Sequence, residues 1–307
     1  MTAAPRLRTV IRRYGYTEPL LDGRARSARV TLDFQPVDGA LRNAMTRMAR
    51  DCAYDLCEMS PTSYLMARLA GAPLTALPVF PFRQFPLDQV IVRADGPVVA
   101  PADLAGARIG MRTWAQPTGL WIREILASLY GCDLSQARWT LVAEDPVAGA
   151  PRPPGTRLLP GRTLEDLLAS GEIDAAFGLH RVPPGGRPLL GDPTGLARTW
   201  YQATGLIPAN HLLVMRADRF DPELGQELCR LFDAARACYL ADIRAAAADP
   251  VIAPLRAVTG LADPLPNGWA ANLPLWRTLA AAAARQGMIT DPADARDLLE
   301  RCSAVNQ

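Results

Sequence analysis

The chain has 307 residues, of which 49% are hydrophobic, and a formal net charge of +2. This length and apolar content predict one large folded domain or two modest ones, and exclude a disordered chain. The small net charge gives no sign of a nucleic-acid or membrane-surface partner. No stretch approaches the roughly 20 apolar residues that a membrane helix needs. Arg12-Arg13 is followed by no apolar core of a secretion signal, so we expect a cytoplasmic protein.

All 33 basic residues are arginine, because the sequence contains no lysine. Pyridoxal phosphate chemistry through an internal Schiff base and a P-loop lysine are therefore both excluded. The six cysteines form no CxxC pair and lie apart from the two histidines, His180 and His211. We therefore expect neither a zinc site nor a disulfide framework.

The first third of the chain alternates strand-like and helix-like segments. This alternation predicts an α/β fold with a mostly parallel sheet. The expected strands are 7–14, 30–34, 54–57, 76–82 and 89–94, and the expected helix before the third strand is 38–51.

Residues 54–69 carry the clearest local signal. An apolar strand ends in Glu58-Met59, and Ser60 then provides a helix N-cap with Pro61 at the first helical position. Ligands of open α/β sheets bind at the carboxyl ends of strands, and helix N-termini favour anions. This turn therefore predicts a carboxylate-binding site beside Glu58.

A second unit begins near Pro101 and repeats this design. A strand to Met111 leads into a polar turn at 113–118 and a helix to Tyr130, and a helix–strand pair follows at 163–178. We expect surface loops at 146–162 and 181–196. The remaining expected elements are a strand at 205–215 that carries His211, helices at 222–248 and 273–287, and a short C-terminal helix.

Two such units predict two lobes with a ligand in the cleft between them. We assign residues 1–95 and 212–307 to the first lobe and residues 96–211 to the second. The chain is then expected to cross between the lobes near 92–100 and near 207–214.

This organisation resembles the type II periplasmic-binding-protein fold, and several blocks resemble the 4,5-dihydroxyphthalate decarboxylase family. The most specific blocks are EMS-x-x-SYLMAR and VFP-x-R. The matching segments are YTEPLLDGR (16–24), YDLCEMSPTSYLMAR (54–68), ALPVFPFRQF (76–85), GLWIREILASLYG (119–131), SGEIDAAF (170–177), YQATGLIPANHLLVM (201–215) and DPLPNGWAAN (263–272).

The chain also departs from the family pattern at polar positions. Pro86-Leu87-Asp88 stands where the family typically has Arg-His-Ser, and Ala209-Asn210 precedes His211. These departures favour either a different substrate or a protein that binds without catalysis.

Two residues are candidates for proton transfer. Glu58 could act as a general acid whose pKa is raised by a partly dry cleft, or it could only stabilise the following helix N-terminus. His211 has a suitable unperturbed pKa, although a lone histidine in an apolar strand is more often structural.

The candidates for substrate binding are hydroxyl, amide and guanidinium side chains near the two turns. Arg83, at the end of a strand bounded by prolines, suits bidentate carboxylate recognition; its alternative role is a surface salt bridge. The full set is Ser60, Thr62, Ser63, Arg83, Thr113, Gln116, Thr118 and Arg123. For each hydroxyl or amide, simple loop or helix capping is the competing interpretation.

The resemblance implies decarboxylation of a hydroxylated, phthalate-like aromatic acid. The ring itself serves as the electron sink, so no organic cofactor is expected; a divalent metal on Glu58, His211 and substrate hydroxyls is the alternative. The expected partner is a small aromatic carboxylate, with a homo-oligomer left open. The competing functions are a non-catalytic cytoplasmic binder or sensor of a small carboxylate, and a lyase that acts on another carboxylate.

Overall fold

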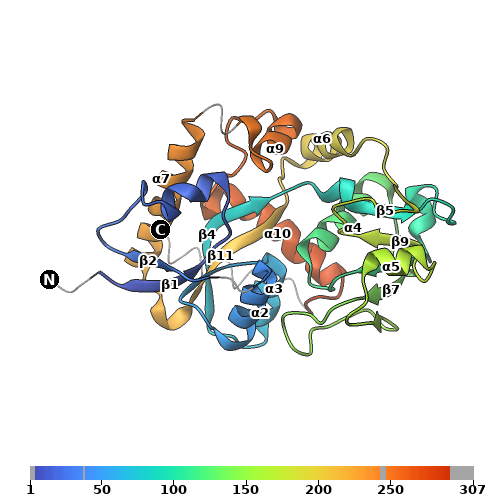
Figure 1. Cartoon of the computed structure of the whole chain (residues 1–307), viewed down its shortest axis with the longest axis horizontal. Helices are drawn as coiled ribbons and strands as arrows, with labels where there is room; N and C mark the ends of the chain where they lie inside the picture. Colours follow the sequence, from blue (N-terminus) through green and yellow to red (C-terminus); the bar gives the residue numbers. More distant parts are fainter. Residues whose placement is uncertain (1–3, 37–38, 243–246, 291–307) are drawn as a thin grey trace.

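The structure is a computed structural model that describes residues 4–36, 39–242 and 247–290 (Figure 1). Two β-sheets with helices packed around them form two lobes, in agreement with the α/β fold that the sequence predicts. No helix among the described residues is long and apolar enough to cross a membrane.

The first sheet has the order β2-β1-β3-β11-β4. Strands β1, β2 and β3 are parallel, whereas β11 runs antiparallel between β3 and β4. Its strands are β1 (Arg6–Val10), β2 (Thr31–Phe34), β3 (Leu56–Met59), β4 (Leu74–Arg83) and β11 (Ala209–Arg216).

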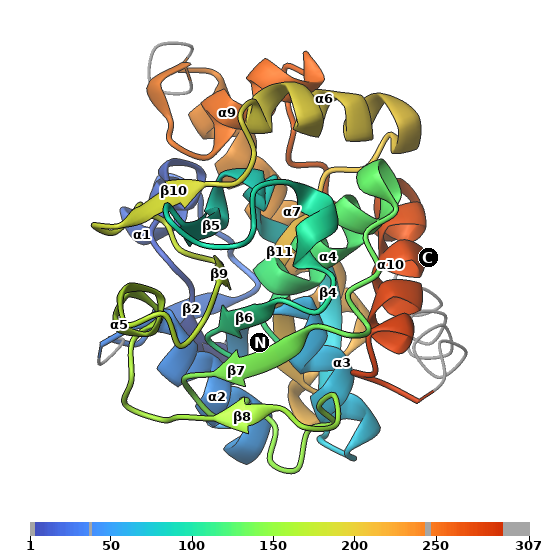
Figure 2. The same ribbon diagram turned by 90° about the vertical axis from the view of Figure 1, so that its right-hand side faces the viewer.

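The second sheet has the order β10-β5-β9-β6-β7-β8 and faces the viewer in Figure 2. Strands β9, β6, β7 and β8 are parallel, and β5 is antiparallel to both of its neighbours. Its strands are β5 (Val90–Arg93), β6 (Arg108–Met111), β7 (Arg138–Leu141), β8 (Arg157–Leu158), β9 (Ala175–Phe177) and β10 (Gly186–Pro188).

Helices cover both faces of the first sheet, as a parallel arrangement requires. Helices α2 (Leu41–Asp51) and α3 (Pro61–Leu69) lie on one face, and α7 (Pro222–Leu240) covers the other. Leu228 and Leu231 of α7 pack in one apolar cluster with Leu213 of β11. The other described α-helices are α1 (Glu18–Leu21), α4 (Pro117–Tyr130), α5 (Leu164–Ala169), α6 (Pro193–Thr204), α9 (Ile252–Thr259) and α10 (Trp269–Arg285).

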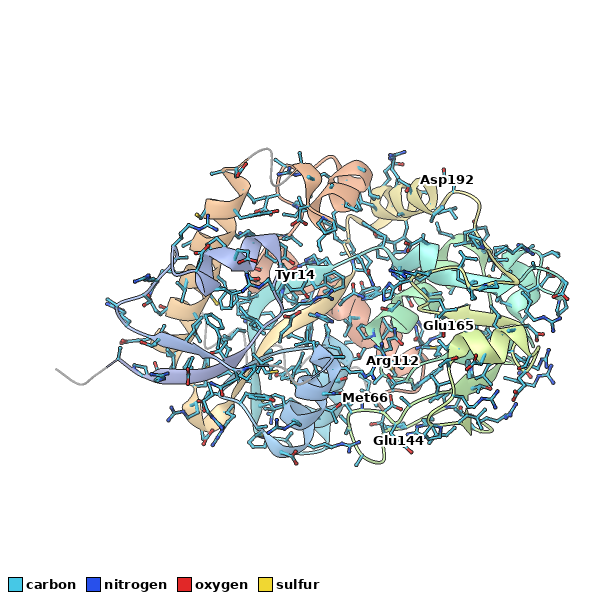
Figure 3. The ribbon with its side chains drawn as sticks, in the orientation of Figure 1. Tyr14, Met66, Arg112, Glu144, Glu165 and Asp192 are labelled. Carbon is cyan, nitrogen blue, oxygen red and sulfur yellow. The ribbon has the colours of Figure 1, made fainter. Side chains whose placement is uncertain are left out.

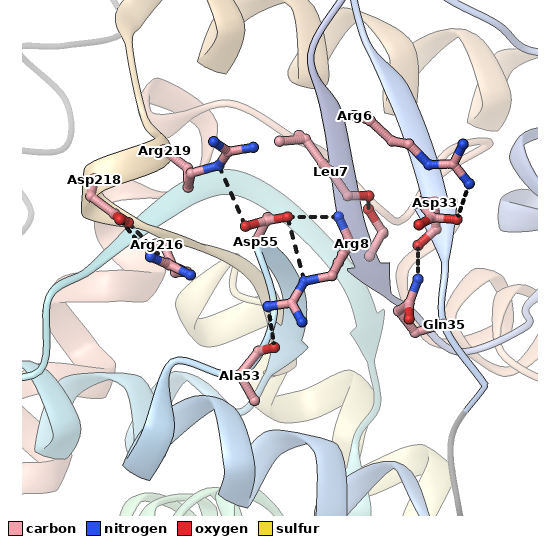
Figure 4. A network of polar contacts seen from close by, with 11 residues as sticks. Arg6, Leu7, Arg8, Asp33, Gln35, Ala53, Asp55, Arg216, Asp218 and Arg219 are labelled. Atoms are coloured by element: carbon pink, nitrogen blue, oxygen red, sulfur yellow. Dashed lines mark hydrogen bonds and ion pairs between the residues drawn. The ribbon is translucent and has the colours of Figure 1, made fainter.

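A charged network ties the start of β3 to β1 and to the segment after β11 (Figure 4). The carboxylate of Asp55 accepts the backbone N–H of Arg8 at 2.8 Å and pairs with the Arg219 guanidinium at 3.4 Å. Because Asp55 is 6% exposed, these donors compensate for its burial. The network helps to fix the register of the strands that carry the site.

Several elements differ from the sequence-based expectation. The third strand is Leu56–Met59, so Glu58 belongs to the strand and not to the turn that follows it. Helices α6 and α9 and strand β7 were not anticipated, and α10 begins at Trp269 even though Pro274 lies inside it. The expected short C-terminal helix falls outside the described residues.

The lobe boundaries remain a prediction, but the sheets refine them at two points. β11, which begins at Ala209 and carries His211, belongs to the first sheet, although the sequence assigned residues up to 211 to the second lobe. β5 belongs to the second sheet, although the sequence assigned residues up to 95 to the first lobe. The chain therefore changes sheets between Arg83 and Val90, and again between Pro188 and Ala209.

Trp121 of α4 links the second lobe to the start of β11. Its side chain is fully buried, and its indole N–H donates to the carbonyl of Ala209 at 2.9 Å. Trp200 packs edge-on against it with ring centroids 6.2 Å apart. The contact fixes α4 beside the strand that carries His211.

We expect Trp121→Ala to lower the free energy of unfolding by about 3–5 kcal/mol, because a large buried ring and a hydrogen bond are lost together. Urea unfolding measures the effect. Tyr130→Ala, on an exposed position of the same helix, serves as control. Equal losses in the two variants would contradict the role of Trp121.

Candidate active site

The strand register places Glu58 and His211 on the same face of the first sheet. Leu213 of β11 lies directly opposite Glu58 of β3, and His211 precedes Leu213 by two residues. Since residues two apart on a strand point to the same face, His211 is the diagonal neighbour of Glu58. The His211 Nδ1 atom lies 2.5 Å from the Glu58 Oε1 atom.

An irregularity between β4 and β11 lies beside this pair. His211 is opposite Phe82, but Leu213 is opposite Leu77, so the two strands are out of step around His211. Pro78 and Pro81 of β4 lack backbone N–H donors, which suits an interrupted ladder. Bulges of this kind redirect side chains next to functional sites.

Glu58 is fully buried but well supplied with donors. Its Oε1 accepts the Tyr14 hydroxyl at 2.6 Å, and its Oε2 accepts the backbone N–H of Arg12 at 2.7 Å. With His211, this gives the carboxylate three hydrogen-bond partners from two segments of the chain, the one that follows β1 and strand β11. Such bonds favour the ionised form of a buried acid.

The expectation that the pKa of Glu58 is raised is wrong. Burial acts in that direction and is the largest influence, but the nearby His211 charge and the three hydrogen bonds together hold the pKa of Glu58 below its usual value. An ionised Glu58 is suited to orienting His211, and not to donating a proton itself.

His211 is the member of the pair that reaches solvent. Its side chain is 16% exposed, against 0% for that of Glu58. Because Nδ1 is bound to Glu58, the other ring nitrogen, Nε2, is left without a hydrogen-bond partner among the described residues. This atom is available to a ligand.

Tyr14 completes the site and was missed by the sequence analysis. Its ring is stacked between Tyr16 and Phe82 with centroids 5.2 and 5.7 Å away, and Phe82 in turn contacts the His211 ring. Burial, followed by the Glu58 charge, raises the pKa of Tyr14, so its hydroxyl stays protonated as a donor. Its position shortly after a strand end was the only available signal.

The two predicted turns meet across the junction of the lobes. The Thr62 hydroxyl donates to the carbonyl of Ala115, which lies within the 113–118 turn. Ser60 caps α3 through the Ser63 N–H at 3.0 Å, and its hydroxyl also contacts those of Thr62 and Ser63 at 3.1 and 2.8 Å. The three hydroxyls are therefore engaged with the protein, and their binding to a carboxylate stays a prediction.

The 113–118 turn holds polar side chains of two kinds. Thr118 approaches the amides of Gln84 and Asn210 at 3.5 Å. By contrast, no side-chain hydrogen bond is formed by Gln116, whose buried carbonyl oxygen lacks a partner, or by Thr113. Buried polar groups without partners are uncommon and mark places where a ligand or water can bind.

Arg83 is held by acceptors within the protein, and it also lines a hollow of about 260 Å³. Its guanidinium is 2% exposed and donates to the carbonyls of Ile207 and Pro266 and to the Asn272 side chain. Burial lowers the pKa of Arg83 to about 9, which leaves it charged at neutral pH. These bonds join separate segments of the chain, while the buried Nε atom has no partner among the described residues, so carboxylate binding by Arg83 stays a prediction.

Arg123 likewise serves the packing of the second lobe. Its guanidinium lies 3.9 Å from the Trp114 ring centroid and donates to the Gln286 side chain at 2.7 Å. A hollow of about 450 Å³ adjoins it, lined in part by Trp114 and Trp139. Neither contact brings Arg123 to Glu58 or His211. Its buried Nη2 atom has no partner among the described residues, and its role in substrate binding stays a prediction.

No family model matches the chain. It is 33% identical to a 4,5-dihydroxyphthalate decarboxylase of Comamonas testosteroni over 258 residues, which cover 78% of both proteins. A protein of the same name from Pseudomonas putida is 32% identical over 214 residues, covering 62% of this chain and 79% of that one. The chain belongs to the 4,5-dihydroxyphthalate decarboxylase family.

Solved structures agree with the fold that the family resemblance implied. The alkanesulfonate-binding protein SsuA of Xanthomonas axonopodis pv. citri superposes with a TM-score of 0.51, covering 97% of this chain and 98% of that one at 14% identity. A sulfonate-binding SsuA of Methylobacillus flagellatus gives 0.50, covering 98% and 96% at 12% identity. At these identities the likeness shows the type II periplasmic-binding-protein fold alone.

For this family member, a metal site would need ligands beyond the Glu58–His211 pair. Within residues 4–36, 39–242 and 247–290, no group of three or more His, Cys, Asp or Glu side chains could hold a metal ion. The described residues therefore do not fit a metal held by protein ligands alone, and no step below is assigned to one.

The lowered pKa of Glu58 predicts a specific dependence of stability on pH. A carboxylate with a depressed folded pKa contributes stability above its usual pKa of 4.5, and this contribution is lost as pH falls through the folded value. The thermal midpoint of the native protein should therefore fall more steeply below pH 4.5 than that of Glu58→Gln. Parallel curves would contradict an ionised, stabilising Glu58.

We expect Arg83→Met to lower the free energy of unfolding by about 2–4 kcal/mol, because three buried acceptors lose a charged donor. Ligand affinity of the folded fraction should not change. Arg277→Met, at an exposed arginine, is the matched control for unfolding. A loss of affinity without a loss of stability would instead restore Arg83 to the binding site.

Proposed function

We propose that the protein removes a carboxyl group from a hydroxylated aromatic acid of the phthalate type, with His211 as the proton donor. The observation that carries this proposal is the asymmetry of His211: Nδ1 is bound to a buried carboxylate, and Nε2 is unpartnered and open to solvent. The family membership supplies the reaction class, since both curated relatives carry the name decarboxylase.

The chemistry balances with protein groups and substrate alone. Electron density from a ring hydroxyl para to the carboxylate increases at the carbon that bears the carboxylate. Protonated His211 delivers the Nε2 proton to that carbon, the C–C bond to the carboxylate breaks, and CO₂ leaves. The electron pair of that bond restores the aromatic ring, and neutral His211 takes up a new proton from water. The ring acts as the electron sink, so the proposal needs no organic cofactor.

Glu58 and Tyr14 support this step without touching the substrate. The Glu58 carboxylate binds the Nδ1 atom of His211 and fixes the orientation of its ring, and the Tyr14 hydroxyl helps to keep that carboxylate ionised. Because the Nδ1 atom always faces Glu58, the proton is always presented at Nε2. Positioned acid–base groups of this kind contribute roughly 10²–10⁴-fold to rates.

We expect His211→Ala to reduce CO₂ release from 4,5-dihydroxyphthalate by about 10²-fold or more, because the proton donor is lost. Steady-state assays of CO₂ and of the monocarboxylic catechol product measure this. His180→Ala removes the other histidine, which is exposed in the second lobe, and should retain full activity. Activity of His211→Ala above half the native value would overturn the proposed role.

Binding without catalysis is the second candidate, and one structural observation favours it. Pro86–Gln89 forms a short 3-10 helix at the crossing between the lobes and carries no basic side chain. A rise in thermal midpoint with 4,5-dihydroxyphthalate, with no CO₂ released from it or from related hydroxylated benzoates, would select this function over decarboxylation.

A further inference from the structure

Arg112 occupies the position where a ligand of this fold is expected. It directly follows β6, and its backbone carbonyl accepts the N–H of Ala143 at 2.9 Å. Figure 3 shows it in the region between α2 and α3 of the first lobe and the second sheet. The carboxyl ends of parallel strands form the binding edge of open α/β sheets.

The guanidinium of Arg112 lacks a counter-charge. Across residues 4–36, 39–242 and 247–290, seven arginines take part in no hydrogen bond or ion pair of their side chains, and only Arg112 among them is partly buried. The exposed ones are Arg12, Arg29, Arg42, Arg138, Arg181 and Arg277. Arg83 and Arg123, which are fully buried, both have acceptors. A partly buried cation without a partner is costly, and it calls for an anion that the protein does not supply.

A second arginine without a partner among the described residues, Arg42, lies on the helix of the first lobe that contacts the segment next to Arg112. Arg42 lies in the first turn of α2, and this helix contacts the second lobe through Arg50, which donates to the carbonyls of Asp145 and Pro146 at 3.0 and 2.8 Å. Burial is the main cause that lowers the pKa of Arg112, and the Arg42 charge adds to it. Like charges repel each other, and an anion bound near both would offset this repulsion.

We propose that Arg112 and Arg42, one from each lobe, bind the carboxylate that the reaction leaves in place, so that the site selects aromatic acids with two carboxylates. A guanidinium binds a carboxylate through two parallel hydrogen bonds, and an anion between the lobes would be held by both. This inference rests on the proposed function for its choice of a carboxylate as the anion and for its assignment to the retained carboxylate, whereas anion binding by Arg112 and Arg42 does not depend on it.

The chemistry of the step argues that the clamp, Arg112 with Arg42, holds the retained carboxylate and not the leaving one. The leaving carboxylate gives up its negative charge when it becomes CO₂. Strong cationic contacts with it would therefore stabilise the substrate more than the transition state and slow the reaction. The retained carboxylate stays charged throughout, so its contacts position the ring at no cost to the rate.

The test compares two unreactive probes, phthalate with two carboxylates and benzoate with one, by calorimetry. We expect the native protein to bind phthalate at least about 10-fold more tightly than benzoate, as a charged hydrogen-bonded contact would give. Arg112→Gln and Arg42→Gln should weaken phthalate binding by about 10-fold and leave benzoate within about 3-fold. Arg112→Lys should be intermediate, and Arg277→Gln should match the native protein.

Folding is checked by the thermal midpoint without ligand. Since Arg112 has no partner among the described residues to lose, Arg112→Gln should keep or raise that midpoint. Substitution of Arg83, which has acceptors within the protein, should lower it. The clamp would be overturned if the Arg112→Gln, Arg42→Gln double variant preferred phthalate over benzoate as strongly as the native protein does. It would also be overturned if the native protein bound the two probes equally well. Loss of the preference for phthalate in the variants supports the clamp. If the native protein also releases no CO₂ from 4,5-dihydroxyphthalate, the clamp stands and the decarboxylase proposal is overturned.

Discussion

The buried charge of Glu58 is the constraint on which the rest of the site depends. A carboxylate with no exposed surface is stable only if hydrogen-bond donors and a nearby cation replace water. Here the donors come from the segment after β1 and from β11, the two strands that flank β3. The sheet order β1-β3-β11 is thus the arrangement that allows Glu58 to be ionised, and an ionised Glu58 fixes the orientation of His211.

The arginines divide into those that build the protein and those left for a ligand. Arg83 and Arg123 are buried against carbonyl and amide acceptors or aromatic rings, and their charges serve packing. Arg112 and Arg42 have no acceptor within the described part of the chain. Since the sequence contains no lysine, this difference in partners, and not residue type, is the basis on which we propose a ligand-binding role for Arg112 and Arg42.

The sequence was a good guide to local structure and to the pair at the centre of the site. The alternation of strands and helices predicted the fold, and the Ser60-Pro61 signal placed the start of α3 where it lies. The sequence could not show that, among the described residues, Arg83 has partners and Arg112 has none, because a partner of Arg83 such as Asn272 lies 189 residues away along the chain. The direction of the Glu58 pKa was wrong for the same reason: it depends on Tyr14 and His211, brought together only by strand pairing. The predicted start of helix α10, at residue 273, lies after the observed start at Trp269, because a proline such as Pro274 is typical of the first turn of a helix.

The two chain segments that connect the sheets leave the first lobe next to each other. They continue from β4 and β11, which are hydrogen-bonded neighbours with Arg83 opposite Ala209. A two-stranded ribbon bends readily across its flat face but resists shear and swivel, because sliding one strand past the other breaks its ladder. Sliding of the lobes past each other at these crossings would therefore break backbone hydrogen bonds of this pair, whereas bending about it would not.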